Sequence, residues 1–230
     1  VRITQCITDA KGDRSRRPGN QDDPDQFGRV VAQRHDGIVI RGAKLMICGT
    51  AASQEIFLLP GGIYGEADAD FAVACVVPRD IEGLTIVEAT RPSDRRELED
   101  TADVETPDTG ITQGWLLFEN VFVPYERVFM CREFNFTAKF IQYFTANYRA
   151  CIGACVTGQG DVMIGAAVLM ARANGLSSKT VSDKLVNMSV NNTITYGLGA
   201  GAIALGFKHP SGSFFADPHT AHTNKVIVAT

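Results

Sequence analysis

The period of the hydrophobic pattern changes near residue 130, and this change constrains the fold more than any other feature. Before it, short runs rich in β-branched and aromatic residues alternate with turn sequences. These runs cover residues 1–8, 29–34, 38–41, 56–59, 71–77, 84–89 and 115–123. After it, apolar residues recur at helical spacing over 134–174 and 179–207. The sequence therefore predicts an α+β chain, with an antiparallel β-barrel or sandwich domain over 1–130 and a helical domain over 131–230.

Turn and cap residues divide the predicted elements. Asp36-Gly37 separates two of the β runs and is a strong hairpin signal. Asn174-Gly175 is typical of a helix end, because these residues tolerate the left-handed conformation. Asp217-Pro218 is a good start for a third helix. The acidic segment 101–108 has no hydrophobic period, so we expect an exposed loop there.

Composition and charge exclude several classes of partner. The 230 residues are 45% hydrophobic, which is enough for a substantial core. The formal net charge is −4 and the basic residues are dispersed apart from Arg14, Arg16 and Arg17, which argues against a nucleic-acid partner. The longest apolar stretch, 162–170, is shorter than the roughly 20 residues of a membrane span, and the first residues do not resemble a signal peptide. We therefore expect a cytoplasmic protein without a membrane partner.

Both ends of the sequence lie inside predicted elements. Val1 begins directly in a strand-like run, and the last residues follow closely on a helix start. We therefore expect this chain to be the middle part of a longer protein.

Six cysteines lie within apolar runs and lack the spacing of a secreted disulfide framework, which predicts reduced thiols. Cys151 and Cys155 are one helical turn apart and so share a face. They could serve a metal, a redox switch or packing. Zinc and iron–sulfur sites need four ligands, and the sequence has no second Cys/His cluster of suitable spacing. The residues alone favour packing, because free cysteine is among the most buried residue types.

The predicted helices contain many glycines, at positions 153, 158, 160, 165, 197, 199 and 201. Each costs up to about 1 kcal/mol of helix stability relative to alanine. Close approach of two helices would offset this cost, and so would an approach of the backbone to a cofactor or substrate. Both explanations remain open at the level of sequence.

Four motifs, in this order, carry a family resemblance. They are "CITDAKGDRS" (6–15), "RHDGIVIRGAKLMICGT" (34–50), "FENVFVPYERVF" (118–129) and "CVTGQGDVMIGAA" (155–167). Together they resemble the 4-hydroxyphenylacetate 3-hydroxylase family, and most of all its branch with 4-hydroxybutyryl-CoA dehydratase and vinylacetyl-CoA isomerase. The resemblance implies an acyl-CoA-dehydrogenase-like fold, in which an N-terminal helical domain, absent here, precedes the β domain. A C-terminal helical bundle follows, of which only the beginning is present.

The same resemblance implies FAD between the β domain and the bundle, and a homodimer or homotetramer. It assigns two segments of the β domain to the flavin. The implied cofactor-binding residues are Thr8, Asp9, Asp13, Arg14 and Ser15 in the first segment and Met46, Ile47, Cys48 and Gly49 in the second. Arg14 could offer its charge to a pyrophosphate or to a substrate phosphate.

The implied catalytic positions depart from the dehydratase pattern. Cys48 stands where that branch has threonine, and Gln113 where it has glutamate. Cys155 matches a ligand of a [4Fe–4S] cluster, but Tyr148 stands at the position of the histidine ligand, and a phenol is not a usual cluster ligand at neutral pH. Ile152 and Val156 replace a tyrosine and a lysine. The inventory of general acids and bases is therefore depleted.

Two enzyme classes follow from the resemblance. The first is an FAD-dependent lyase or isomerase of the dehydratase type, with or without the cluster, acting on a hydroxyacyl- or enoyl-CoA. The second is a reduced-flavin-dependent monooxygenase that hydroxylates a phenol. A third reading is a non-catalytic protein that keeps the fold and has lost the chemistry.

Overall fold

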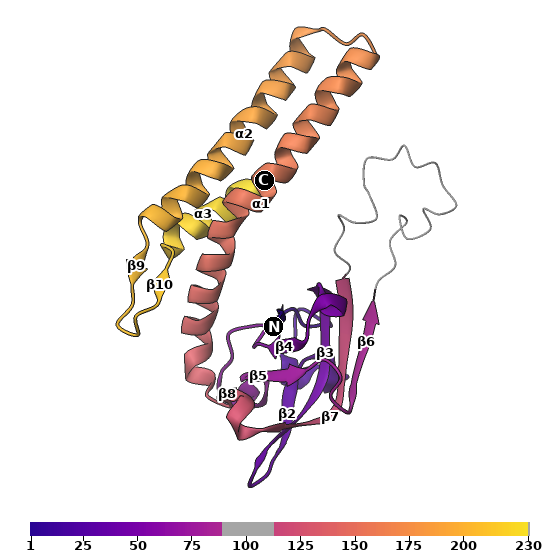
Figure 1. The fold of residues 1–230 in the computed structure, drawn as a ribbon, viewed down its shortest axis with the longest axis vertical. Coiled ribbons are helices and arrows are strands. Elements are labelled where there is room, and N and C mark those ends of the chain that lie inside the picture. Colours follow the sequence, from indigo (N-terminus) through magenta and orange to yellow (C-terminus); the bar gives the residue numbers. More distant parts are fainter. Residues whose placement is uncertain (89–112, 230) are drawn as a thin grey trace, which may run out of the picture. The chain divides into compact units, whose positions relative to one another are not determined.

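The computed structural model describes residues 1–88 and 113–229, so the predicted loop at 101–108 lies outside the described residues. The chain divides into two compact units, Val1–Ala138 and Lys139–Thr230. The first contains the two four-stranded β-sheets, and the second contains most of the helical residues and a two-stranded ribbon (Figure 1).

Two four-stranded sheets form the β unit. The first has the order β1-β4-β5-β8 and the second the order β2-β3-β7-β6. The strands of the first are β1 (Ile3–Cys6), β4 (Glu55–Leu58), β5 (Val73–Pro78) and β8 (Val128–Cys131). Those of the second are β2 (Arg29–Gln33), β3 (Gly37–Cys48), β7 (Gln113–Pro124) and β6 (Leu84–Glu88). Short 3₁₀ turns connect them at Pro18–Asn20, Pro24–Gln26, Thr50–Ala52, Glu66–Phe71, Tyr125–Arg127 and Phe134–Phe136.

One core joins the two sheets into a sandwich. Every strand of both sheets except β6 and β8 contributes fully buried side chains to it, and Ile86 of β6 and Val128 of β8 pack against it. On β7 buried and exposed residues alternate from Gln113 to Phe118, as expected for a strand with one face on a core. The α+β class and the β sandwich predicted from the sequence are thus observed.

The strand predictions need two corrections. The hairpin at Asp36-Gly37 is confirmed, because β2 and β3 pair antiparallel and the Arg34 amide donates to the Gly37 carbonyl at 2.8 Å. The sheets are not purely antiparallel, however, because β1 pairs with β4 in parallel, with Ile3 opposite Glu55. The run predicted from residue 71 begins as a strand at Val73, because Phe71 still closes a 3₁₀ turn.

The helical unit is built mainly from two long helices and a shorter one. They are α1 (Thr137–Ala173), α2 (Lys179–Ala204) and α3 (Pro218–Ala229), with the two-stranded ribbon β9 (Phe207–Lys208) and β10 (Phe214–Phe215) between α2 and α3 (Figure 1). The first predicted helix is one unbroken element. The second ends at Ala204 and not at residue 207, because Phe207 pairs with Phe215 in the ribbon.

The helix ends follow the signals in the sequence. Gly175 has a φ of 63°, its amide donates to the Arg172 carbonyl, and the Leu176 amide donates to the Ala171 carbonyl at 2.9 Å. This is the Schellman pattern that ends a helix. At the start of α3, the Thr220 amide donates to the Asp217 carboxylate at 2.7 Å, so Asp217 caps the helix as its position before Pro218 predicts.

Small residues set the spacing of α1 and α2. A Cβ atom added to Gly199 would lie 2.5 Å from the Cα atom of Gly153, and the converse holds. The two backbones therefore touch there, which explains these two glycines by close helix approach. Apart from the adjoining backbone of its own helix, a Cβ atom at Gly158, Gly165 or Gly197 would have no atom of the described residues within 4 Å. Close helix approach is thus not realised at those three positions within the described residues.

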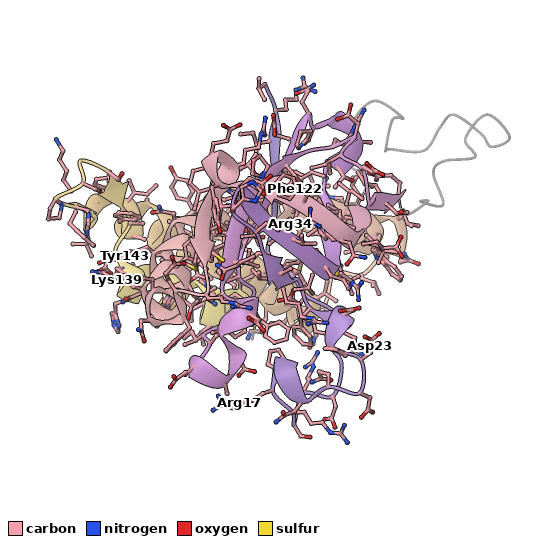
Figure 2. All side chains as sticks on the ribbon, turned by 90° about the horizontal axis from the view of Figure 1, so that it is seen from below. Arg17, Asp23, Arg34, Phe122, Lys139 and Tyr143 are labelled. Atoms are coloured by element: carbon pink, nitrogen blue, oxygen red, sulfur yellow. The ribbon has the colours of Figure 1, made fainter. Side chains whose placement is uncertain are left out.

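Aromatic and cationic side chains meet on the surface of each unit. In the helical unit Tyr143 of α1 stacks on Phe215 of the ribbon, with ring centroids 4.5 Å apart. Figure 2 labels Lys139 beside Tyr143, and the Lys139 ammonium lies 5.9 Å from that ring. In the β unit the Arg34 guanidinium lies 5.5 Å from the Phe122 ring (Figure 2). Such exposed contacts are worth roughly 0.5–1 kcal/mol each.

The segment Phe134–Ala173 is long and apolar enough to cross a membrane by length and composition alone. It is longer than the uninterrupted apolar stretch at 162–170, because glycines and polar residues lie between its other apolar residues. A single helix of this kind is weak evidence for a membrane span and does not indicate a membrane protein.

Candidate functional site

The second predicted flavin segment, which starts at Met46, begins within an irregularity of β3. Opposite β7, Lys44 pairs with Leu116 and Ile47 pairs with Gly114, so Leu45 and Met46 together face one residue. This is a β-bulge, which re-aims side chains locally. Met46 adopts a φ of 56° and its side chain is 59% exposed, whereas Ile47 is buried in the core.

The bulge lies against the first predicted segment. The Leu45 amide donates to the Thr8 carbonyl at 2.8 Å. The structure therefore brings together the residues around Thr8 and Met46, which are far apart in the sequence.

A buried ion pair lies behind this junction. The Lys44 ammonium is 2.6 Å from the Asp9 carboxylate, and both side chains are almost completely buried. The same ammonium donates to the carbonyls of Ile7 at 3.1 Å and Leu59 at 2.9 Å. The Gly28 amide donates to Asp9 at 3.2 Å. The Asp9 side chain is thus turned into the interior, so it does not face a ligand directly.

Tyr64 completes this buried group. Burial raises the pKa of the Tyr64 phenol well above its ordinary value, and the negative charge of Asp9, to which it hydrogen-bonds, raises that pKa further. Tyr64 is therefore a neutral hydrogen-bond donor. Sequence reasoning missed both Tyr64 and Lys44. The available signal was a lysine inside the apolar strand run "IVIRGAKLMI", where a charge needs a buried partner.

The rest of the first segment is a loop held by its own polar side chains. The Asp13 carboxylate accepts from the amide of Ser15 at 2.9 Å and from its hydroxyl at 2.7 Å, and these bonds lower the pKa of Asp13. The side-chain amide of Gln21 bonds to both the amide and the carbonyl of Asp13. Asp13 and Ser15 therefore shape the loop. Arg14 is exposed and has no ion pair among the described residues, so its guanidinium is available to a phosphate.

Two of the predicted catalytic residues are neighbours. Cys48 and Gln113 are cross-strand partners at the ends of β3 and β7, and the Gln113 amide nitrogen lies 3.5 Å from the Cys48 sulfur. Both are exposed. They lie beside Gly49, which adopts a φ of 72° and begins a turn. An open hollow of about 550 Å³ borders Cys48, Gly49 and Thr4.

The other two predicted residues lie on α1 in the helical unit. The Tyr148 side chain is 65% exposed and stacks on Phe144, with ring centroids 6.4 Å apart. Cys155 and Cys151 are both exposed, so packing does not account for these thiols within the described unit. Across residues 1–88 and 113–229 no three His, Cys, Asp or Glu residues form a group that could hold a metal ion.

Two family models and a known enzyme match most of this chain. Residues 1–130 match the family model described as "4-hydroxyphenylacetate 3-hydroxylase N terminal", and residues 137–230 match the corresponding C-terminal model. The 4-hydroxybutyryl-CoA dehydratase/vinylacetyl-CoA-Δ-isomerase of Clostridium aminobutyricum is 38% identical over 94% of this chain and 44% of its own length. The chain therefore spans less than half of this relative.

Solved structures give the same picture. An oxygen-tolerant archaeal 4-hydroxybutyryl-CoA dehydratase from N. maritimus has a TM-score of 0.86 at 33% identity, covering 98% of this chain and 45% of that one. The oxygenase component of 4-hydroxyphenylacetate 3-monooxygenase, complexed with FAD and 4-hydroxyphenylacetate, has a TM-score of 0.76 at 22% identity, covering 96% and 46%.

Butyryl-CoA dehydrogenase from Megasphaera elsdenii has a TM-score of 0.63 at 15% identity, covering 99% of this chain and 54% of that one. This likeness confirms the acyl-CoA-dehydrogenase-like fold expected from the sequence. Because the family models match both parts of the sequence, the chain belongs to the 4-hydroxyphenylacetate 3-hydroxylase family.

Proposed function

We propose that this chain is part of an FAD-dependent lyase or isomerase that acts on a hydroxyacyl- or enoyl-CoA. The observation that carries the proposal is the 38% identity to the Clostridium aminobutyricum dehydratase/isomerase over 94% of the chain. The archaeal dehydratase structure supports the same activity at a TM-score of 0.86. Both relatives extend well beyond this chain, so the activity is proposed for the whole protein.

The residues of the β unit fit a flavin. The Thr8 carbonyl bonds to Leu45 at the bulge in β3, where the exposed thioether side chain of the neighbouring Met46 offers an apolar contact to a ring system. The Arg14 guanidinium, which has no ion pair within residues 1–88 and 113–229, suits a pyrophosphate, because arginine presents a fork of donors that matches phosphate oxygens. Bound at this bulge, the flavin would supply the redox-active ring that the protein side chains lack.

The neighbouring Cys48 and Gln113 would orient a substrate beside that ring. The Gln113 amide can donate and accept hydrogen bonds but cannot gain or lose a proton near neutral pH. It therefore positions a group where a glutamate would transfer a proton. Of these two neighbours, the Cys48 thiol is the one that can exchange a proton.

The test is FAD binding by the full-length protein purified without oxygen. We expect about one FAD per chain and conversion of 4-hydroxybutyryl-CoA or vinylacetyl-CoA to an isomeric or dehydrated enoyl-CoA. Replacing Thr8 and Arg14 together by alanine should empty the flavin site, whereas Arg34→Ala, on the surface next to Phe122, should leave it filled. Full flavin occupancy in the Thr8/Arg14 variant would refute the assignment of the site.

A second candidate is a monooxygenase that hydroxylates a phenol with reduced flavin and O₂. The likeness to the FAD-bound oxygenase favours it, together with the loss of a carboxylate at Gln113. Supplying reduced FAD, air and 4-hydroxyphenylacetate separates the two candidates. Formation of a catechol without turnover of either acyl-CoA would favour the monooxygenase.

Cys155 belongs to no group of three or more possible metal ligands among the described residues, and Tyr148 stands where the resemblance expects the histidine ligand. We propose that at most three protein ligands are available to a cluster, Cys155 and two from outside this chain. Tyr148→His should then raise the iron content per chain after anaerobic reconstitution of the full-length protein. Cys155→Ala should abolish any iron that is present. Four irons per chain in the unmodified protein, unchanged by Tyr148→His, would contradict this assignment.

We further propose a homodimer or homotetramer in the cytoplasm. Exposed apolar side chains along α1 and α2, among them Met163, Leu169 and Val186, support association with other helices. The cysteine spacing, which does not suit a secreted disulfide framework, supports a reducing compartment.

A further inference from the structure

The buried pair Asp9–Lys44 stands directly behind the two segments proposed to face the flavin. Asp9 follows Thr8 in the chain, and Lys44 precedes the bulge residues Leu45 and Met46. The side chains of Asp9 and Lys44 are 6% and 1% exposed. No solvent-facing role is open to either charge.

Stability alone is a poor explanation for this pair. Two buried charges lose their hydration, and replacing such a pair with apolar residues of similar volume is often neutral or stabilising. The contacts of the pair instead fix the positions of the surrounding segments. The Lys44 ammonium has three acceptors at 2.6–3.1 Å, on Asp9, Ile7 and Leu59. Asp9 in turn accepts from the Gly28 amide and bonds to Tyr64. One ion pair thus fixes four separate stretches of the chain.

The backbone next to Lys44 has an unfavourable conformation that surrounding contacts must hold in place. A φ of 56° at Met46 is unfavourable for a residue with a side chain, and it persists only where the surroundings hold it. Three anchors surround it here. Lys44 is tied to Asp9 on one side, Ile47 is buried in the core on the other, and the Leu45 amide between them bonds to Thr8.

We infer that Asp9–Lys44 is a positioning pair, which holds Thr8 and the Leu45–Met46 bulge in the conformation that receives the flavin. This inference rests on the proposed function. It assigns Asp9 a role through Lys44 and not a contact with the cofactor. It also explains why a lysine lies in an otherwise apolar strand. The pair holds the Leu45–Met46 bulge in its binding conformation before the flavin binds, and without the pair the bulge would relax. A bulge that is already ordered binds the flavin more tightly, because less conformational freedom is lost on binding.

The experiment replaces both charges in the full-length protein, with Lys44→Met and Asp9→Leu combined. The matched control is Arg127→Met combined with Glu55→Leu, which removes a half-exposed pair of 2.9 Å elsewhere in the same sandwich. We expect the Lys44/Asp9 variant to unfold cooperatively on heating but to bind FAD at least about tenfold more weakly, with an altered visible circular dichroism band of the bound flavin. The control should keep both the affinity and the band.

A third substitution separates positioning from a general loss of structure. Met46→Gly removes the conformational cost of the bulge, because glycine adopts a positive φ freely. In that background, loss of the Asp9–Lys44 pair should weaken FAD binding by a smaller factor than in the background with methionine. Equal factors would overturn the inference.

The remaining outcomes are also decisive. Wild-type affinity and an unchanged flavin band in the Lys44/Asp9 variant would overturn the positioning role while leaving the proposed function intact. A variant without a cooperative thermal transition would make the pair a structural element and would also overturn the inference. Failure of the unmodified full-length protein to bind FAD would instead refute the proposed function itself.

Discussion

Two glycines of α2, only two residues apart, have opposite surroundings. Gly199 touches the backbone of α1 at Gly153, whereas a Cβ atom at Gly197 would meet no atom of the described residues within 4 Å apart from the adjoining backbone of α2. The same residue type on one helix therefore serves close packing at one position and leaves space open at the other. Sequence reasoning could not separate them, because the crossing point of two helices depends on the rotation of both.

Alanine substitutions should separate these two positions. Gly197→Ala should stabilise the helical unit by roughly 0.5–1 kcal/mol, because alanine has the higher helix propensity. Gly199→Ala should destabilise it by about 1–3 kcal/mol, because the added methyl group forces the helices apart. Urea unfolding of the full-length protein, followed by far-UV circular dichroism, measures both changes. Equal shifts for the two variants would contradict the observed crossing.

The six thiols differ as sharply as the glycines. Cys6 and Cys75 lie in the β core, where burial raises the pKa of Cys75 to about 12 and that of Cys6 higher still. Cys48, Cys151 and Cys155 are exposed. Because the thiolate is the reactive form, iodoacetamide at mildly alkaline pH should modify the exposed thiols at least roughly 100-fold faster than the two buried ones. Urea should abolish this difference.

Mass spectrometry of digested, time-resolved samples provides the measurement. Cys131 is half-buried with a raised pKa, so we expect an intermediate rate for it. Rapid modification of Cys75 in the folded chain would show that the core of the sandwich is not closed as described.

At the scale of elements, the sequence predicts the turns and helix ends that depend on a few adjacent residues. The hairpin at Asp36-Gly37, the end of α1 at Gly175 and the start of α3 at Pro218 each depend on a few adjacent residues, and each was found from the sequence. The parallel pairing of β1 with β4 depends on a crossover of the chain that leaves no local signal.

The candidate site was predictable only in part for a related reason. The family resemblance predicts flavin contacts at Thr8 and Met46, and in the structure the Thr8 carbonyl bonds to Leu45, the neighbour of Met46. The bulge at Leu45–Met46 contains no glycine and shows no turn signal, so the sequence does not reveal it. Lys44 and Asp9 are 35 positions apart in the numbering (44 − 9), and their pairing emerges only when the sheets close.

The cap of α3 gives a pH-dependent prediction at this scale. Hydrogen bonds from Thr220 lower the pKa of Asp217 below its ordinary value of 3.8. A lowered pKa in the folded state means that the cap stabilises α3 above pH 3.8, and that this contribution is lost as the pH falls through the lowered pKa. We therefore expect the start of α3 to loosen in acid, because the protonated carboxyl is a weaker acceptor.

Hydrogen exchange at the Thr220 amide, corrected for the intrinsic effect of pH, measures this loosening. Asp217→Asn is the matched control, since asparagine is also a good N-cap but does not titrate. The variant should lose the acid-dependent part of the exchange and keep protection near neutral pH. The same acid dependence in both proteins would assign the loosening to another group.

At the scale of the whole chain, the two units differ in what their cores can support. The β unit buries large side chains completely, including Ile38, Leu58 and Phe118. The buried cluster of the helical unit consists of alanines, while Met163 and Leu169 of α1 are more than 60% exposed. Alanines bury little apolar surface, and the hydrophobic free energy scales with that surface. The helical unit therefore gains less hydrophobic free energy from its own core than the β unit does.

Separate expression of the two units tests this difference. The piece 1–138 should unfold in urea through one cooperative transition, because it carries a closed sandwich core. The piece 139–230 should show a shallow, non-cooperative loss of helical signal and should bind a hydrophobic dye, because isolated helices with exposed apolar faces lack fixed packing. Far-UV circular dichroism and dye fluorescence distinguish the two behaviours. A sharp transition for 139–230 in a monomer would show that contacts between α1, α2 and α3 suffice, and the exposed apolar residues would then need another explanation.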